Sequence, residues 1–296
     1  MISDAKDLDY KSLCYMNQEK LKRAGVKIPL TNEQENELKK CASDIEYFIQ
    51  NYVKILTLDS GMQTMQLRPY QEEFINACFY NRYVITMMAR QMGKTTTVMA
   101  YLLHQAITRE HIRIAILANK GDTAKEILDR LKQAYEELPY YMQVGVKEWN
   151  KNSITLGNGT KIIAAATSSG SIRGKSCHIL YLDEFAHIDN DADFYTSTYP
   201  VISSGKTSQV LITSTPNGLN LFYKLYTEAK EKRNHFVPLF YNWRHNPNYD
   251  EDWYESTNLN MSPQQFAQEY ECEFQGSAAT LLSGACLQRL TMVDPL

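Results

Sequence analysis

The feature that most constrains the fold is an alternation, from residue 83 onward, between short apolar runs and longer stretches with a helical period. The runs at 83–88, 112–118, 178–182, 209–213 and 236–241 predict buried strands, and most of the stretches between them predict helices. Strands separated by helices form a mainly parallel sheet that is covered on both faces. We therefore expect an α/β fold, in which ligands bind at the carboxyl ends of the strands.

The segments around this alternation carry weaker signals. Residues 1–30 show no clear period, but Thr31 and Gln34 have the spacing of a capping box. The apolar residues after them recur every three or four positions, so we expect one amphipathic helix as far as Tyr52. Two short runs flank the Gly-Asn-Gly turn at 157–159 and predict a β-hairpin.

Composition and charge exclude several classes of protein. No apolar stretch approaches the roughly 20 residues of a membrane span, and the acidic N-terminus lacks the plan of a signal peptide. The six cysteines form no C-x-x-C pair, so neither a zinc site nor a disulfide framework is indicated. The net charge is −3, yet residues 244–273 carry seven acids and one base, which leaves the rest slightly positive. We expect a soluble intracellular protein whose charge is compatible with contact to a polyanion.

A phosphate-binding loop is predicted between the first strand of the alternation and the helix after it. Such a loop presents the first N–H groups and the positive dipole end of the helix to an anion. Lys94 would reach the β- and γ-phosphates, Thr95 would hold Mg²⁺, and Gly93 would let the backbone approach ATP. The pattern is incomplete because Met88 replaces its first glycine. The expected nucleotide-binding residues are Arg90, Gln91, Met92, Gly93, Lys94, Thr95 and Thr96.

A second motif supplies the acids that nucleotide hydrolysis requires. The run Ile179-Leu-Tyr-Leu182 ends in Asp183 and Glu184, which a parallel sheet would bring to its carboxyl edge. There Asp183 could bind Mg²⁺ and Glu184 could polarise the attacking water. Together the two motifs predict a P-loop NTPase of the class with an added strand and a catalytic Glu.

Two further groups of residues are candidates for parts of the same site. Thr213, Ser214 and Thr215 end the next strand, from which ATP motors sense the γ-phosphate and couple hydrolysis to movement. Tyr70 and Gln71 lie just before the phosphate-loop strand, where a Gln amide could read the adenine edge and an aromatic ring could stack.

Two arginines are candidates for an arginine finger. We favour Arg90 as the finger in cis. Arg173, in the Ser- and Gly-rich segment 168–174, stays open as a finger in trans or as a DNA contact. The six histidines show no metal-ligand spacing and were assigned structural roles, and the aromatic residues between Phe236 and Tyr254 were assigned to packing.

Taken together, three motifs resemble those of the large terminase subunit of tailed bacteriophages, closest to the contractile-tailed, headful-packaging type. The motifs are Arg90-Gln-Met-Gly-Lys-Thr95, Tyr181-Leu-Asp-Glu-Phe-Ala186 and Thr213-Ser-Thr-Pro-Asn-Gly-Leu-Asn220. They occur in order and at compatible spacings, and the resemblance extends from about Phe48 to Leu282. It implies a helicase- or terminase-like P-loop ATPase with small helical subdomains at both ends.

The resemblance implies a motor that uses ATP and Mg²⁺ to drive double-stranded DNA through the portal protein into a procapsid. It also implies a small terminase subunit as partner, a ring of about five copies of the chain, and action in the cytoplasm of an infected bacterium, transiently at the procapsid portal. Lys94, Glu184 and Arg90 then carry catalysis, Thr95 and Asp183 hold the metal, and Thr213 to Thr215 couple hydrolysis to movement.

The same resemblance sets the expected division of the chain. We expect a helical N-terminal region at 1–60, an ATPase core at 61–245, a helical lid at 246–276, and the start of a linker at 277–296. The family has a second, RNase H-like nuclease domain where this sequence stops, so we expect this chain to hydrolyse ATP without cutting DNA. Two alternatives stay open, namely a helicase-like or restriction-type DNA translocase and a nucleotide site that serves assembly only.

Overall fold

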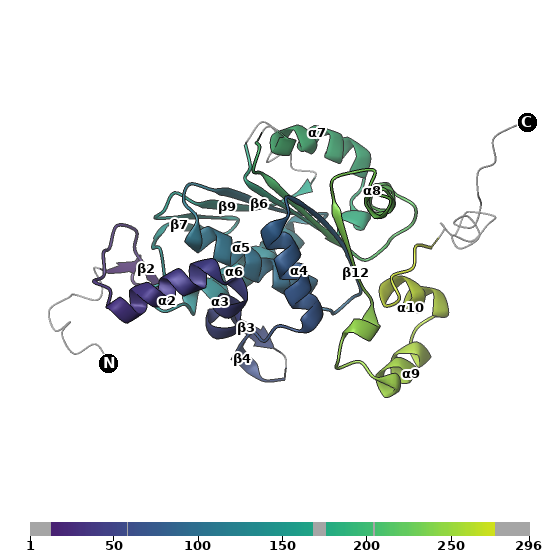
Figure 1. The fold of residues 1–296 in the computed structure, drawn as a ribbon, viewed down its shortest axis with the longest axis horizontal. Helices are drawn as coiled ribbons and strands as arrows, with labels where there is room; N and C mark the ends of the chain where they lie inside the picture. The colour runs from purple at the N-terminus through teal and green to yellow at the C-terminus, as the bar shows by residue number, and fades with distance from the viewer. Residues whose placement is uncertain (1–12, 58, 168–175, 204, 276–296) are drawn as a thin grey trace, which may run out of the picture.

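The computed structural model describes residues 13–57, 59–167, 176–203 and 205–275. An eight-stranded sheet crosses the molecule in the order β12-β5-β11-β10-β6-β9-β8-β7 (Figure 1). Its strands are β5 Tyr83–Met88, β6 Arg113–Ala118, β7 Val146–Asn150, β8 Ser153–Leu156, β9 Lys161–Ala166, β10 Ile179–Asp183, β11 Gln209–Ser214 and β12 Val237–Tyr241. The strands from β12 to β9 pair in parallel, whereas β9, β8 and β7 pair antiparallel.

Helices cover both faces of this sheet, as Figure 1 shows. The helices on one side are α2 Asn32–Ser43, α3 Ile45–Tyr52, α4 Pro69–Tyr80, α5 Lys94–Thr108 and α6 Gly121–Glu136. On the other side lie α7 Asp191–Ser203 and α8 Leu221–Lys230. Among the described residues, no helix combines the length and apolar character needed to cross a bilayer. The expected α/β fold with a mainly parallel central sheet is confirmed.

The strands are buried because both faces of the sheet carry apolar side chains. All five residues of β10 are buried, and five of the six residues in each of β5, β6 and β11 are buried. Parallel strands sandwiched between helices read as continuous apolar runs for this reason. One contiguous core extends from Leu21 through the sheet to Cys272.

The N-terminal region differs from the single helix that we expected. Asp44 interrupts the helical pattern, so α2 ends at Ser43 and α3 begins at Ile45. The break occurs because Asp44 adopts an extended conformation and its carboxylate accepts the Tyr47 N–H at 2.9 Å, which caps the second helix. The region also contains two hairpins, formed by β1 Cys14–Tyr15 with β2 Gln18–Lys22 and by β3 Lys54–Thr57 with β4 Gly61–Thr64.

The C-terminal part of the described chain forms a small aromatic unit beside β12. Its helices are α9 Glu251–Leu259 and α10 Pro263–Glu269, and short 3₁₀ turns occur at Trp243–His245 and, after β10, at Phe185–His187. The side chains of Trp243, Phe266 and Tyr270 form a buried cluster separate from the main core. Trp253 and Tyr254 pack on that cluster, which agrees with the packing role predicted for these aromatic residues.

Candidate nucleotide site

The phosphate loop has the strained backbone that anion binding requires. It joins the end of β5 to Lys94, the first residue of α5, and Gly93 occupies the N-cap with a φ of 78°. Gln91 also has a positive φ, of 60°. The left-handed backbone favours glycine here, and a Cβ on Gly93 would lie 2.7 Å from Nε2 of Gln71, so the Gln71 side chain would have to move.

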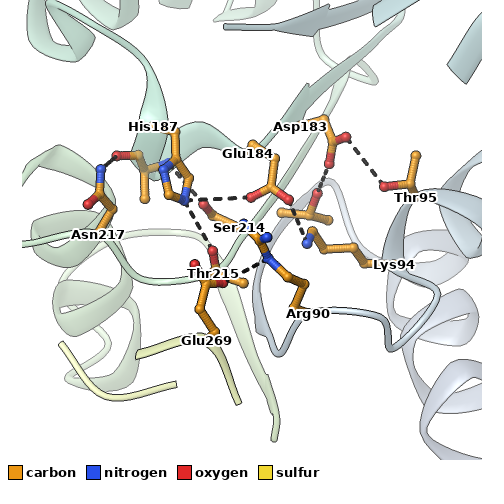
Figure 2. A network of polar contacts seen from close by, with 12 residues as sticks. Arg90, Lys94, Thr95, Asp183, Glu184, His187, Ser214, Thr215, Asn217 and Glu269 are labelled. Atoms are coloured by element: carbon orange, nitrogen blue, oxygen red, sulfur yellow. Dashed lines mark hydrogen bonds and ion pairs between the residues drawn. The ribbon is translucent and has the colours of Figure 1, made fainter. Parts of the chain in front are cut away.

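Lys94 and Glu184 meet at the carboxyl edge of the sheet. The Nζ of Lys94 lies 2.6 Å from Oε1 of Glu184, and the lysine side chain is only 8% exposed (Figure 2). Burial by itself raises the pKa of Glu184, but the charge and hydrogen bond of Lys94 outweigh burial and hold that pKa below its usual value. Glu184 is therefore ionised at neutral pH and paired with Lys94.

Asp183 and Thr95 form an all-oxygen pair next to that contact. Thr95 Oγ1 lies 3.4 Å from Oδ2 of Asp183, while Oδ1 of Asp183 accepts hydrogen bonds from Tyr181 and Thr213 at 2.7 and 2.8 Å. Burial and the charge of Glu184 raise the pKa of Asp183. One carboxylate and one hydroxyl suit Mg²⁺, which binds few protein ligands and takes the rest from water and phosphate. These two residues therefore fit a magnesium ion.

The turn that carries Glu184 is strained and tied to its surroundings. Glu184 has a φ of 50°, an uncommon value for a residue with a side chain, and such strain gathers at functional sites. No described residue hydrogen-bonds its second oxygen, Oε2, which lies 3.9 Å from Nε2 of His187. A buried carboxylate oxygen with the His187 ring 3.9 Å away and no hydrogen bond from a described residue is suited to accept one from a water molecule.

The residues predicted to couple hydrolysis to movement are buried rather than open to the site. Thr213, Ser214 and Thr215 are at most 2% exposed. Their hydroxyl groups contact Asp183, the backbone N–H of Ala186, and Nε2 of His187, at 2.8, 3.0 and 3.1 Å. The end of β11 is thus bonded to the turn that follows Asp183.

Tyr70 and Gln71 lie behind the phosphate loop. The hydroxyl of Tyr70 donates to the carbonyl of Met92 at 2.9 Å. The carboxamide of Gln71 accepts the Arg68 N–H at 3.1 Å and donates to Thr97 Oγ1 at 3.1 Å. Because both side chains are at most 6% exposed, their polar groups contact the protein itself in this structure.

The remaining predicted residues are placed as follows. Thr96 Oγ1 faces Arg130 of α6 at 3.5 Å. The exposed side chain of Arg90 pairs with Glu269 of α10, with 3.1 Å between Nε and Oε2 (Figure 2). Arg173 and the segment from 277 onward lie outside the described residues.

Sequence reasoning missed three residues that the fold brings to the site. The spacing of the histidines predicts only a structural role for His187, yet it contacts Thr215 and faces Glu184. Tyr181 and Glu269 were assigned no chemistry. The position of His187 three residues after the catalytic candidate was the one available signal, since a tight turn brings such positions together.

Comparison with known proteins agrees with this geometry. The model of the family described as "Terminase large subunit, T4likevirus-type, N-terminal" matches residues 85–289, more than half of the 296 residues. The terminase large subunit of Escherichia phage T5 is 24% identical over 197 residues, which cover 66% of this chain and 44% of that protein. The chain thus spans less than half the length of this relative.

Two solved structures share the fold. The large terminase of bacteriophage HK97 has a TM-score of 0.65 at 17% identity, over 79% of this chain and 55% of that one. The large terminase ATPase domain of Thermus phage P74-26 has a TM-score of 0.57 at 20% identity, over 71% of this chain and 100% of that one. The family match, which covers the phosphate loop, Asp183 and Glu184, and β11, confirms the resemblance, and the chain belongs to the family of T4-like terminase large subunits, N-terminal part.

Proposed function

We propose that this chain is the ATP-hydrolysing motor part of a bacteriophage terminase that packages double-stranded DNA. The observation that carries the proposal is the ion pair between Lys94 and Glu184 beside Asp183 and Thr95, at the carboxyl edge of a parallel sheet. Membership of the terminase family supports it independently.

In this proposal ATP rearranges the charges of the site. The phosphates attract Lys94, which leaves Glu184 without its cation. Glu184 then accepts a proton from the water that attacks the γ-phosphate, with ADP as the leaving group. Thr95 and Asp183 would hold Mg²⁺, which would neutralise charge on the phosphates. Arg90 stabilises the γ-phosphate in cis, and Arg173 remains the candidate finger in trans.

The other assigned residues act around this centre. Gln91, Met92, Gly93 and Thr96 form the loop and the first helical turn that surround the phosphates. Tyr70 and Gln71 hold that loop and helix through hydrogen bonds to Met92 and Thr97. To recognise adenine, Gln71 would have to give up its hydrogen bond to Thr97 or the one from Arg68. Thr213 to Thr215 couple the state of the site to movement.

We further propose the division into a 1–60 region, a 61–245 core, a 246–276 lid and the start of a linker at 277–296. The separate aromatic cluster of Trp243, Phe266 and Tyr270 supports a lid. Family membership supports the proposal that the chain acts with double-stranded DNA, the portal protein, a small terminase subunit and further copies of itself in a ring. The proposed place of action is the procapsid in the host cytoplasm.

The test is steady-state ATP turnover of the wild type beside Glu184→Gln, with and without linear duplex DNA. We expect Glu184→Gln to lower turnover by at least ~100-fold, because general-base catalysis contributes about 10²–10⁴, while binding of a fluorescent ATP analogue persists. Glu35→Gln, at an exposed position on α2, is the matched control. Turnover that survives in Glu184→Gln would refute the assignment.

A further inference from the structure

Arg90 of the phosphate loop is attached to the lid by two contacts. Its Nε lies 3.1 Å from Oε2 of Glu269, and its backbone N–H donates to the carbonyl oxygen of the same residue at 2.9 Å. Figure 2 shows the two side chains facing each other. The contacts join positions 179 residues apart in the sequence, so they depend on the tertiary structure alone.

The location of Glu269 is not explained by helix stability. It is the last residue of α10, where the helix dipole disfavours a negative charge. Its side chain is 18% exposed, and within the described part of the chain Arg90 is the cation that pairs with it. The nearby Glu271 is instead held by Arg244 and by the indole N–H of Trp243, at 2.9 Å for the latter. Glu269 therefore compensates the charge of Arg90 rather than stabilising its own helix.

The Arg90–Glu269 pair also joins two packing units. In the sequence Glu269 stands between Phe266 and Tyr270, two members of the aromatic cluster. Arg90 follows the buried end of β5, which belongs to the main core. A change of partner at Arg90 therefore releases one of the bonds between the lid and the phosphate loop.

We propose that Glu269 is a positioning residue that holds Arg90 on the lid until the γ-phosphate of ATP takes its place. The inference rests on the proposed function, because it assumes that Arg90 meets the γ-phosphate. Arg90 uses one of its five N–H donors on Glu269 and is 60% exposed, so the pair is weak and readily exchanged. A phosphate accepts two parallel guanidinium hydrogen bonds and is the stronger partner. ATP, but not ADP, then draws Arg90 from the lid.

The test compares the affinities of ATPγS and ADP, measured by calorimetry. An exposed ion pair shifts an equilibrium by roughly two- to fivefold, so Glu269→Gln should tighten ATPγS binding by about that factor and leave ADP unchanged. Glu269→Asp, which keeps the charge but shortens the reach, should shift the affinity in the same direction by less. Glu271→Gln is the matched control on the same lid and should leave the ATPγS to ADP ratio unchanged.

A second readout follows the lid itself. The described chain has Trp243 and Trp253 in or against the aromatic cluster that includes Phe266 and Tyr270 of the lid, and Trp149 on β7, so a Trp149→Phe background reports on that cluster. ATPγS should change its tryptophan fluorescence, and Glu269→Gln should abolish most of that change.

The outcomes separate the inference from the function on which it rests. A wild type that binds neither nucleotide overturns the proposed function. Wild-type binding with an unchanged ATPγS to ADP ratio in Glu269→Gln overturns the inference. A ratio that still shifts when Arg90→Gln is already present also overturns it, because the effect of Glu269 would not pass through Arg90.

Discussion

Replacing Lys94 with Met should destabilise the nucleotide-free protein more than replacing Glu184 with Gln. The positive charge of Lys94 acts on two carboxylates. Glu184 lies 2.6 Å from the ammonium group, and Asp183, which is only 2% exposed, also feels that charge. Burial and the charge of Glu184 already raise the pKa of Asp183, and Lys94 opposes that rise. Lys94→Met leaves both acids without this cation, whereas Glu184→Gln leaves Lys94 beside Asp183.

The size of the effect follows from burial. Breaking a fully buried ion pair from one side costs roughly 3–5 kcal/mol. The side chain of Glu184 keeps 33% exposure, so we expect the lower figure of about 2–3 kcal/mol for Lys94→Met. For Glu184→Gln we expect about 1 kcal/mol, the net value of one hydrogen bond. At about 2 °C per kcal/mol for a chain of this size, Lys94→Met should lower the melting temperature by about 4–6 °C.

The assay is urea unfolding without nucleotide or Mg²⁺, followed by circular dichroism, for both single variants and the double variant. Because the two side chains contact each other, the double variant should lose less stability than the two single losses added together. Lys147→Met, at an exposed position on β7, serves as control. Additive losses, or a Lys94→Met midpoint equal to that of the control, would refute the electrostatic account.

Three further predictions concern other parts of the structure. Burial lowers the pKa of His104, so acidification below the unfolded pKa of about 6.5 favours the unfolded chain, and the loss of stability in urea between pH 7.5 and pH 5.5 should be smaller in His104→Gln than in the wild type. Gly93→Ala should weaken ATP binding by about tenfold, since a Cβ meets Gln71 and the backbone is left-handed, and Gln71→Ala should restore part of the affinity. Gln71→Met should weaken ATP and GTP binding alike in competition assays, whereas a loss confined to ATP would show that Gln71 contacts adenine directly.

The parts of the site that sequence could predict lie at the ends of regular elements. A buried strand followed by Gly93-Lys94-Thr95, and another that ends in Asp183-Glu184, have fixed places in a parallel sheet, because the carboxyl ends of its strands share one edge. The fold therefore places Asp183 and Glu184 at the same edge of the sheet as Lys94, and Glu184 contacts Lys94 there.

The features that sequence did not predict depend on contacts between distant segments or on the capping of a helix by one side chain. The helical period continues through Asp44, and only the capping geometry shows that two helices form there. The pairing of Arg90 with Glu269 joins residues far apart in the chain, and neither motif contains the partner. Tyr70 and Gln71 were assigned to adenine on the basis of side-chain chemistry, but their hydrogen bonds to the loop depend on the position of α4 against α5.

The burial of the end of β11 limits how ATP hydrolysis could be coupled to movement. Thr213 and Thr215 are at most 2% exposed, and their hydroxyl groups contact Asp183 and His187. Under the proposed function, a change in phosphate occupancy would therefore reach β11 through the acidic pair and the strained turn at Glu184. That proposal has Glu184 lose the cation Lys94 to the phosphates, so the turn at Glu184 would be the element of the site whose electrostatic balance changes most. Hydrogen bonds between β10 and β11 would then carry the change into the sheet.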